Sequence, residues 1–568
     1  MSIAVGPKMT PLSLKTYRNQ TGLTLTGDVG VQPVLRGPCA RAWKRLIRWG
    51  RAGWVTCVVL LPLAGCVTGP RLLAPEQQKS IDRRLVETPA GFELKPVAEN
   101  LTAPSAIAFD TEGNLLIAES GACGREPRIF GWRVNGDGKF FQIYPTGARF
   151  SLPFTSVKTG FRIYGPVGGM VVDHGKVYVS HRDAESRGVI TAFEFDGSHS
   201  TVVADLPAQG DYSVTDLALG PNGRLYFGMG AATNSGVVGR DNWDAGWVKR
   251  FRKVHDIPYI DLKLNGYRFD AKNPLAGLFE DEIAVTAPFQ PFGKSNETWV
   301  RKSPTGKPNA AVYSVSPTGG DLRVEAFGIR RPSGLMFNEF GTLYFTNQGM
   351  EMRGTRPVKD DPDALLRLVP GASYGWPDYS ADLRSISESI FQPPIEAIIR
   401  SGYREVSAVI DQTASGTSKP NRDVLLKGVF QPLSGASKLD FVPGAGAFSD
   451  YRGNAIVALW GDRAPFATTG MKLIGPTGYK VVRVDVDTGA VSDFLRNTRA
   501  VPASRLEGDD EGTLALERPI DVKFGPDGAM YILDFGELSM RGGRERVPNQ
   551  TGRVFKLVAI PEAPTTQE

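Results

Sequence analysis

Histidine and cysteine are scarce in this sequence, with four of each among 568 residues. No two histidines have the spacing of metal ligands, and no Ser-His-Asp order is evident, so neither a zinc site nor a hydrolase triad is indicated. No basic stripe with interleaved aromatic residues appears beyond the N-terminal region, although the formal net charge is +6. The composition therefore argues against nucleic-acid binding.

Long apolar runs are also missing. The run from Trp54 to Gly65 follows five basic residues and precedes Cys66, and it is shorter than the roughly 20 residues that span a bilayer. Its last residues, Leu63-Ala64-Gly65-Cys66, resemble a bacterial lipobox. We therefore expect an N-terminal extension and signal peptide over residues 1–65, and a tether over 66–90 that is lipidated at Cys66. The alternative is a coincidental Cys after a signal sequence.

These features predict an exported protein that is held by lipid at the membrane of the bacterial cell envelope. Processing would remove Cys39 and Cys57 and leave Cys66 and Cys123. One lipidated and one remaining thiol provide no internal disulfide framework.

Glycine and proline are abundant, at 65 and 41 residues, and they recur at fixed positions of an internal repeat. Each copy is a pair of short apolar runs around a Gly-containing turn, which is typical of a β-hairpin. Five copies keep the same distance between their first residue and the turn glycine; they begin at Pro104, Pro166, Val214, Pro332 and Pro519, and turn at Gly113, Gly175, Gly223, Gly341 and Gly528. A sixth, looser copy runs from Lys438 to Trp460.

Hairpins with further alternating runs between them predict an all-β fold, a six-bladed β-propeller with four-stranded blades over residues 91–560 and a short tail over 561–568. A β-sandwich or two barrels would not explain the constant register. Two gaps between copies exceed a normal blade and predict long inserted loops at Thr233–Ala310 and Gly349–Leu433. Because both gaps flank the Arg330 hairpin, we expect them to crowd one sector of one face.

Residues just before each copy should ring one mouth of a propeller. This ring is cationic and aromatic: Tyr164, Tyr212, Arg330, Arg331, Lys438 and Arg518. Because arginine forks bind carboxylates and stack on planar rings, the ring suits a small, planar polyanion. Alternatively, the arginines pair with Glu517 and with Asp361 or Asp363 and close the mouth.

Several of these stretches resemble the glucose/sorbosone dehydrogenase family. Phe327–Leu335 is similar to the family's G-x-R-N-P-x-G-L motif, and Tyr374–Asp378 and Arg518–Val522 add to the resemblance. The inserted Thr233–Val238 resembles an exported bacterial subgroup. The resemblance implies a six-bladed propeller that uses pyrroloquinoline quinone (PQQ) with calcium to oxidise a sugar or a related alcohol or aldehyde.

The same resemblance implies roles for individual residues. Tyr212 stands where the family has its histidine base, and Arg330 would polarise the quinone. Arg331, where the family has Asn, would bind the quinone carboxylates together with Lys438 and Arg463. Trp376 would supply a stacking face, and no metal ligands are assigned.

Two other functions stay open because Tyr212 replaces the catalytic histidine. A non-catalytic propeller could keep the cationic mouth for a carbohydrate or another ligand of the cell envelope. A structural scaffold for envelope proteins would instead present an exposed apolar patch.

Overall fold

The structure is a computed structural model that describes residues 69–134, 138–145, 161–276, 282–295, 301–463, 476–506, 514–541 and 544–561. The chain divides into two units, Met1–Cys66 and Val67–Glu568, and every described residue belongs to the second. The predicted signal peptide, Cys66 and nearly all of the C-terminal tail lie outside the described residues.

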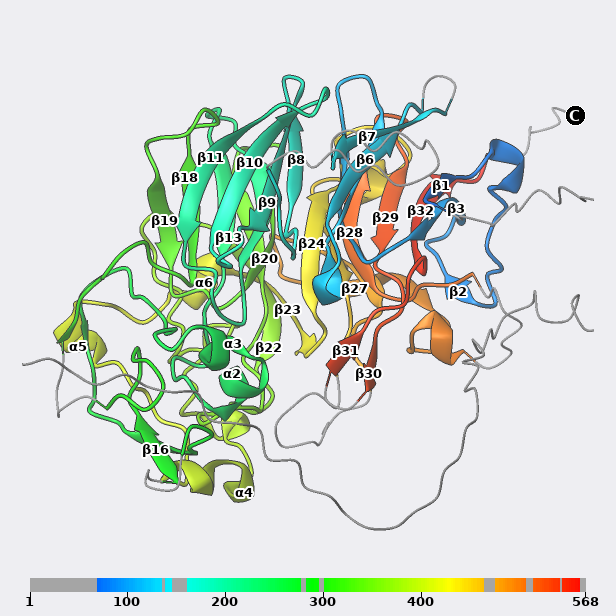
Figure 1. The fold of residues 1–568 in the computed structure, drawn as a ribbon. Coiled ribbons are helices and arrows are strands. Elements are labelled where there is room, and N and C mark those ends of the chain that lie inside the picture. Colours follow the sequence, from blue (N-terminus) through cyan, green and yellow to red (C-terminus); the bar gives the residue numbers. More distant parts are fainter. Residues whose placement is uncertain are drawn as a thin grey trace, which may run out of the picture. The chain divides into compact units, whose positions relative to one another are not determined.

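Six antiparallel sheets of at least four strands form the second unit, with β4, β8, β12, β20, β24 and β28 innermost (Figure 1). From the axis outward, blade 1 contains β4 (Pro104–Phe109), β5 (Leu115–Glu119), β6 (Arg128–Trp132) and β7 (Phe140–Tyr144). Blade 2 contains β8 (Met170–Asp173), β9 (Lys176–Arg182), β10 (Gly188–Glu194) and β11 (His199–Leu206). Blade 3 contains β12 (Val214–Leu219), β13 (Leu225–Met229), β18 (Ala311–Val315) and β19 (Arg323–Phe327).

The second half of the ring follows the same plan. Blade 4 contains β20 (Pro332–Phe337), β21 (Leu343–Asn347), β22 (Pro362–Arg367) and β23 (Leu426–Pro432). Blade 5 contains β24 (Ala436–Phe441), β25 (Ala455–Leu459), β26 (Lys480–Val484), β27 (Val491–Asn497) and, outermost, β2 (Val86–Glu87). Blade 6 contains β28 (Pro519–Phe524), β29 (Met530–Asp534), β32 (Gly552–Ala559), β3 (Phe92–Leu101) and β1 (Arg71–Leu72).

The predicted six-bladed propeller is therefore confirmed, and the repeat corresponds to the inner hairpin of each blade. The five turn glycines and Gly453, the turn glycine of the looser copy, have a positive φ, between 73° and 81°. Side chains with a Cβ rarely adopt this conformation, which explains why the glycine keeps its place in every copy.

The ring closes through strands from opposite ends of the described chain. The N-terminal strand β3 pairs with the C-terminal strand β32 along most of its length. Closure of this kind covers sheet edges that would otherwise expose unpaired backbone groups.

The described part of the predicted tether, residues 69–90, packs on the propeller instead of hanging free. Its strands β1 and β2 extend blades 6 and 5. Ile81 and Val86 are buried in a core cluster with Phe494. The expectation of a tether was wrong here because two isolated apolar residues, which show no periodicity in the sequence, find partners far along the chain.

Buried acids join neighbouring blades near the axis. Asp216 Oδ2 accepts a hydrogen bond from the Leu335 amide at 3.0 Å, which ties blade 3 to blade 4. Asp521 Oδ2 accepts one from the Ile107 amide at 3.0 Å, which ties blade 6 to blade 1. These bonds fix the inner strands against one another and hold the mouth in place.

The two long insertions lie together in the sector of blades 3 and 4, as the sequence predicts (Figure 1, lower left). The first holds α2 (Arg240–Asp244), α3 (Trp247–Arg250), β14 (Leu262–Lys263), β15 (Phe269–Lys272), β16 (Ile283–Thr286) and β17 (Arg301–Lys302). The second holds α4 (Ile395–Ile398), α5 (Gln412–Ser415) and α6 (Arg422–Leu425). The range expected for it, Gly349–Leu433, also contains β22 and β23, which belong to blade 4.

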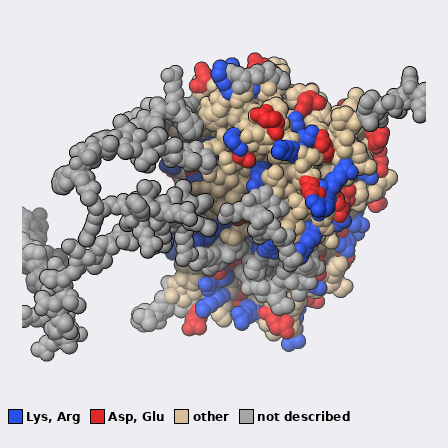
Figure 2. Space-filling view, turned by 90° about the vertical axis from the view of Figure 1, so that its right-hand side faces the viewer, with Lys and Arg blue, Asp and Glu red and all other residues tan. Residues whose placement is uncertain are grey.

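Within the described ranges, no helix is both long and apolar enough to cross a membrane. On the face that Figure 2 shows, Lys and Arg residues are interspersed with Asp and Glu residues.

Candidate functional site at the propeller mouth

A cavity of about 670 Å³, the mouth cavity, opens where all six blades converge. Its lining comes from the start of the innermost strand of each blade, from the loop before that strand, and from the chain at or after the end of the second strand. Among the described residues, the lining includes seven Lys and Arg side chains but four Asp and Glu side chains. The volume is that of a typical small-molecule site, and the charge balance favours an anionic ligand.

Arg331, Lys438 and Arg463 line the sector of blades 4 and 5, which we call the blade 4/5 wall. Arg331 donates to the side-chain oxygen of Gln348 at 2.7 Å, and no ion pair to it is found among the described residues. Burial, and then the neighbouring Arg463, lower the pKa of Arg331 to about 10, so it keeps its charge at neutral pH. An incoming carboxylate would relieve this uncompensated positive charge.

Lys438 lies near the axis and is 3% exposed. Its Nζ lies 3.2 Å from Asp216 Oδ1 and 3.6 Å from Asp521 Oδ2. Both contacts are ion pairs, but neither has hydrogen-bond geometry, so the buried Nζ of Lys438 makes no hydrogen bond within the described residues. Buried donors of this kind normally have a partner, and a ligand in the mouth cavity can supply one.

Trp460 provides an aromatic face in the same sector. Arg518 lies 4.4 Å and Arg463 lies 5.0 Å from its ring centroid. The Trp460 indole N–H is buried without an acceptor among the described residues. Cations stacked on an aromatic ring beside free N–H donors suit a planar, anionic ligand.

The structure brings Arg331, Lys438, Arg463 and Tyr212 together, but it places Arg330 beneath the cavity. Arg330 is 2% exposed and does not line the cavity. Its Nε donates to the Asn234 carbonyl at 3.1 Å, and its Nη1 donates to the carbonyl of Gly349. Its Nη2 donates to the Tyr212 hydroxyl and to Glu351 Oε1 at 3.1 Å.

Arg330 thus belongs to a group of buried ionic and polar residues that we call the paired layer: Tyr212, Arg330, Glu351, Arg353 and Asp241. Arg353 pairs with Asp241 at 2.6 Å and with Glu351 at 3.2 Å. All the donors of Arg330 are engaged, so it holds Tyr212 in place and does not itself reach a ligand.

Tyr212 does not have the properties of a base. Burial raises the pKa of its phenol, Glu351 raises it further, and the opposing effects of Arg330 and Arg353 do not reverse the shift. The Tyr212 hydroxyl lies 3.1 Å from Glu351 Oε1, to which it donates. A phenol in this environment stays protonated at neutral pH.

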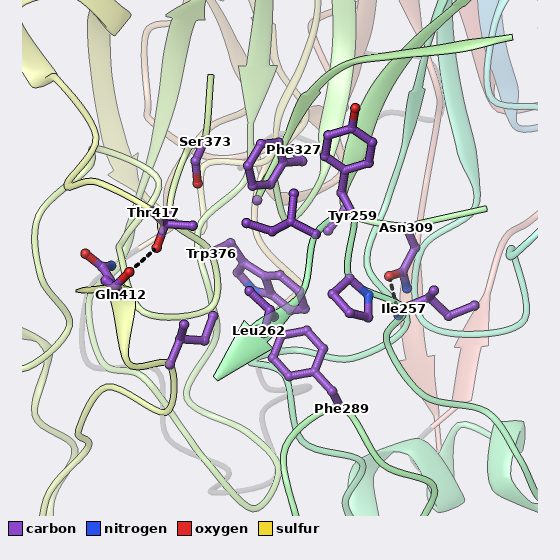
Figure 3. Close-up of a pocket in the computed structure, with 16 residues that line it drawn as sticks. Ile257, Tyr259, Leu262, Phe289, Asn309, Phe327, Ser373, Trp376, Gln412 and Thr417 are labelled. Carbon is purple, nitrogen blue, oxygen red and sulfur yellow. Dashed lines mark hydrogen bonds between the residues drawn. The ribbon is translucent and has the colours of Figure 1, made fainter. Parts of the chain in front are cut away.

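Trp376 lies away from the mouth, between the two insertions (Figure 3). It lines a separate cavity of about 40 Å³ with Leu262 and Phe289, and its indole N–H donates to the Asn234 carbonyl at 3.2 Å. The structure therefore does not bring Trp376 to the ligand that the resemblance implies. Trp460 has that position instead.

The alternative, in which the arginines pair with Glu517 and with Asp361 or Asp363 and close the mouth, is wrong because these acids have other partners. Glu517 accepts hydrogen bonds from Ser504, and the two oxygens of Asp361 accept backbone amides of Met350 and Ala381. Asp363 likewise accepts backbone amides. These acids support loops, and they leave the mouth open.

Sequence reasoning used only the loop before each innermost strand, apart from Arg463, and therefore missed half of the lining. The loop after the second strand contributes Ser120, Arg182, Gln348, Trp460 and Phe535. These residues could have been identified from the sequence, because each of them lies at or just after the end of the second apolar run of a repeat copy.

No protein-family model and no curated protein matches the chain. Among solved structures, the PQQ domain of a pyranose dehydrogenase from Coprinopsis cinerea is similar over 84% of this chain and 98% of its own, at 16% identity and a TM-score of 0.46. A PQQ-bound aldose sugar dehydrogenase from Streptomyces coelicolor is similar over 83% and 99%, at 14% identity and a TM-score of 0.41. The likeness is one of fold, and the six blades follow from this chain's own strand pairing.

Proposed function

We propose that the mouth cavity binds PQQ, a planar quinone with three carboxylates, and that the protein is an oxidoreductase acting on a sugar or a related alcohol. The observation that carries this proposal is the blade 4/5 wall, where Arg331 has no ion pair among the described residues and the buried Nζ of Lys438 makes no hydrogen bond, next to the ring of Trp460. The resemblance of Phe327–Leu335 to a quinone-dependent family supplies the identity of the ligand.

The residues present fit the quinone but give no side-chain set for calcium. Arg331, Lys438 and Arg463 would hold the carboxylates, and Trp460 would lie against the ring system. Among the described residues, no three His, Cys, Asp or Glu side chains gather into a possible metal site. Calcium, which the resemblance implies, would then be held largely by backbone carbonyl oxygens and water, and we assign no step to it.

When bound, the quinone accepts two electrons from the substrate alcohol, which becomes a carbonyl. The chain must then receive the hydroxyl proton at a group that lines the cavity. We assign this role to Asp211, which lines the mouth cavity beside Tyr212. Asp211 Oδ1 accepts from the Asn242 amide at 3.0 Å and Oδ2 lies 2.7 Å from Arg353 Nη2, so the carboxylate is held in one orientation. Tyr212 and Arg330 position this strand end without exchanging protons.

The experiment that tests the function is titration of the purified full-length chain with PQQ, followed by assay of aldose oxidation with an artificial electron acceptor. We expect saturable binding, measured with and without added calcium. Asp211→Asn should lower kcat by about 100-fold or more, whereas Tyr212→Phe should lower it by about tenfold or less. Absence of saturable PQQ binding would refute the proposal.

A non-catalytic binding propeller is the alternative, and two features of the site make it worth testing. No histidine lines the mouth cavity among the described residues, and Tyr212 has a raised pKa. This candidate predicts that PQQ or another polyanion binds, but that no aldose or related alcohol is oxidised by the loaded protein.

We also propose that the protein is exported and anchored by a lipid on Cys66. The order of basic residues, apolar run and Leu63-Ala64-Gly65-Cys66 supports this proposal. Radiolabelled palmitate should enter the wild-type chain when it is expressed in a bacterium, and Cys66→Ala should abolish the labelling. Equal labelling of both chains would contradict the proposal.

A further inference from the structure

A second group of cations faces the mouth cavity and has no part in the proposed quinone site. Arg182, at the end of β9 in blade 2, lines the cavity and is 8% exposed. Its guanidinium lies 4.8 Å from the ring centroid of Trp247, and its Nη2 donates to the Gly210 carbonyl at 3.2 Å. Its Nε is buried and has no hydrogen-bond acceptor among the described residues.

Arg250 stands beside it on the same side of the cavity. It comes from α3 of the first insertion, lines the cavity and is exposed. Its Nη2 donates to the Ser186 hydroxyl at 3.1 Å. Burial lowers the pKa of Arg182 to about 10; the charge of Arg250 adds to that shift, and the charge of Asp211 opposes it. We call this pair the blade 2/3 wall.

The acids nearby are engaged with other arginines. Asp183 binds Arg187 Nε at 2.8 Å, and Asp211 pairs with Arg353 at 2.7 Å. Neither Arg182 nor Arg250 has an ion pair within the part of the chain that the structure describes. Two neighbouring cations that have no direct ion pair among the described residues, one of them with a buried free donor, favour the binding of an anion.

The blade 2/3 wall and the blade 4/5 wall line different sectors of one cavity. If the blade 4/5 wall holds the quinone carboxylates, the blade 2/3 wall faces the remaining space. A neutral sugar would leave that charge uncompensated. A substrate with its own carboxylate would accept from the free Nε of Arg182 and from Arg250.

We infer that Arg182 and Arg250 form a carboxylate subsite, and that the substrate of this oxidoreductase is an acidic sugar, such as a uronic or aldonic acid. The inference rests on the proposed function for the reaction, but the subsite itself is a property of the cavity. In the reaction, an alcohol of the acid would be oxidised to a carbonyl, the bound quinone would take up the two electrons, and Asp211 would receive the hydroxyl proton. The substrate carboxylate is unchanged and serves only for binding.

The test compares D-glucuronate with D-glucose by isothermal titration calorimetry on the full-length chain, before and after loading with PQQ. We expect glucuronate to bind at least about tenfold more tightly than glucose in both states. Arg250→Gln is the main variant because its side chain is exposed and the fold does not depend on it. It should weaken glucuronate binding about tenfold and leave glucose binding unchanged.

Arg252→Gln is the matched control, since Arg252 is an exposed neighbour outside the cavity lining. It should change neither affinity. Arg331→Gln tests whether the blade 4/5 wall binds the glucuronate carboxylate. We expect the preference for glucuronate over glucose to survive this substitution. Arg182→Lys, checked first for a normal thermal unfolding transition, should also lose the preference because a lysine lacks the Nε donor.

Equal affinities for glucuronate and glucose would overturn the inference, as would undetectable glucuronate binding. A preference that survives both Arg250→Gln and Arg182→Lys, or one that disappears in Arg331→Gln, would also overturn it. These results are separable from a failure of the proposed function. If the chain binds glucuronate through Arg250 but does not bind PQQ, the carboxylate subsite is supported and the proposed dehydrogenase function is refuted.

Discussion

The paired layer and the blade 4/5 wall each contain one of two neighbouring arginines, and these two arginines differ in the partners that they find. Arg330 and Arg331 are consecutive and begin the same hairpin. Arg330 is buried, with its donors on Tyr212, Asn234, Glu351 and a backbone carbonyl. Arg331 has one side-chain acceptor, Gln348, and lines an open cavity.

The difference shows how one strand end can serve stability and binding together. Successive side chains at a strand end point in opposite directions, so a change of one position exchanges the protein interior for the cavity. A buried charge with all its donors engaged has no capacity for a ligand. A charge with missing acceptors stabilises the folded chain less but can bind an anion.

The sharpest test of the comparison is the stability of two matched variants. Arg330→Met should lower the free energy of unfolding by about 3–5 kcal/mol, because it removes one of the two arginines that pair with Glu351 and leaves the carbonyls of Asn234 and Gly349 without this donor. Arg331→Met should lower it by less than about 1 kcal/mol. Denaturation in urea measures both. Equal losses would mean that the two arginines do not differ in role.

Acidification should weaken the paired layer selectively. Burial alone would raise the pKa of Glu351, but Arg353 and Arg330 outweigh it and hold the pKa well below the usual 4.5. The contribution of this carboxylate is therefore complete above pH 4.5 and is lost as the pH falls through the folded-state pKa. Glu351→Gln should cost about 2–3 kcal/mol of unfolding free energy at neutral pH. The difference between wild type and variant should shrink between pH 5 and pH 3, and a constant difference would contradict the assignment.

In the blade 4/5 wall, a substitution should change the ligand affinity and leave the stability of the fold nearly unchanged. Arg331→Gln should raise the Kd for PQQ about tenfold, or about 1.4 kcal/mol, and leave the thermal unfolding midpoint nearly unchanged. Fluorescence titration measures the affinity, with Arg252→Gln as the control outside the cavity. If the affinity stays and the stability falls, Arg331 is a structural residue.

Salt concentration should have the smallest effect of the four tests, and it should act on the blade 4/5 wall more than on the paired layer. Raising the NaCl concentration from about 50 mM to about 500 mM shortens the screening length severalfold and should weaken PQQ binding about threefold. The buried pairs of Arg353 should be screened much less, so the stability lost in Glu351→Gln should stay constant over this range. Salt-independent ligand binding would argue against a cationic wall as its basis.

Much of the fold could be predicted from the sequence because propeller repeats are local. The glycines at Gly113, Gly175, Gly223, Gly341 and Gly528 mark turns that each hairpin needs for itself. The extra strands β1 and β2 could not be predicted in this way, since each is two residues long and pairs with a strand distant in the sequence.

The site was predicted in part, for the same reason. Tyr212, Arg331, Lys438 and Arg463 were placed at the mouth, and the structure brings all four to one cavity. Arg330 and Trp376 were expected there too, but Arg330 lies beneath the cavity and Trp376 lines a different one.

The sequence by itself determined the number of blades, the register of their hairpins and the cationic character of one mouth. These follow from short-range patterns: turn glycines, alternating apolar residues and the loops beside them. Only the tertiary structure decided which arginines are neutralised by acids and which face the cavity without a partner. Ion pairs such as Arg353 with Asp211 and Asp241 join residues from separate loops, and burial sets their strength. No local pattern encodes either property.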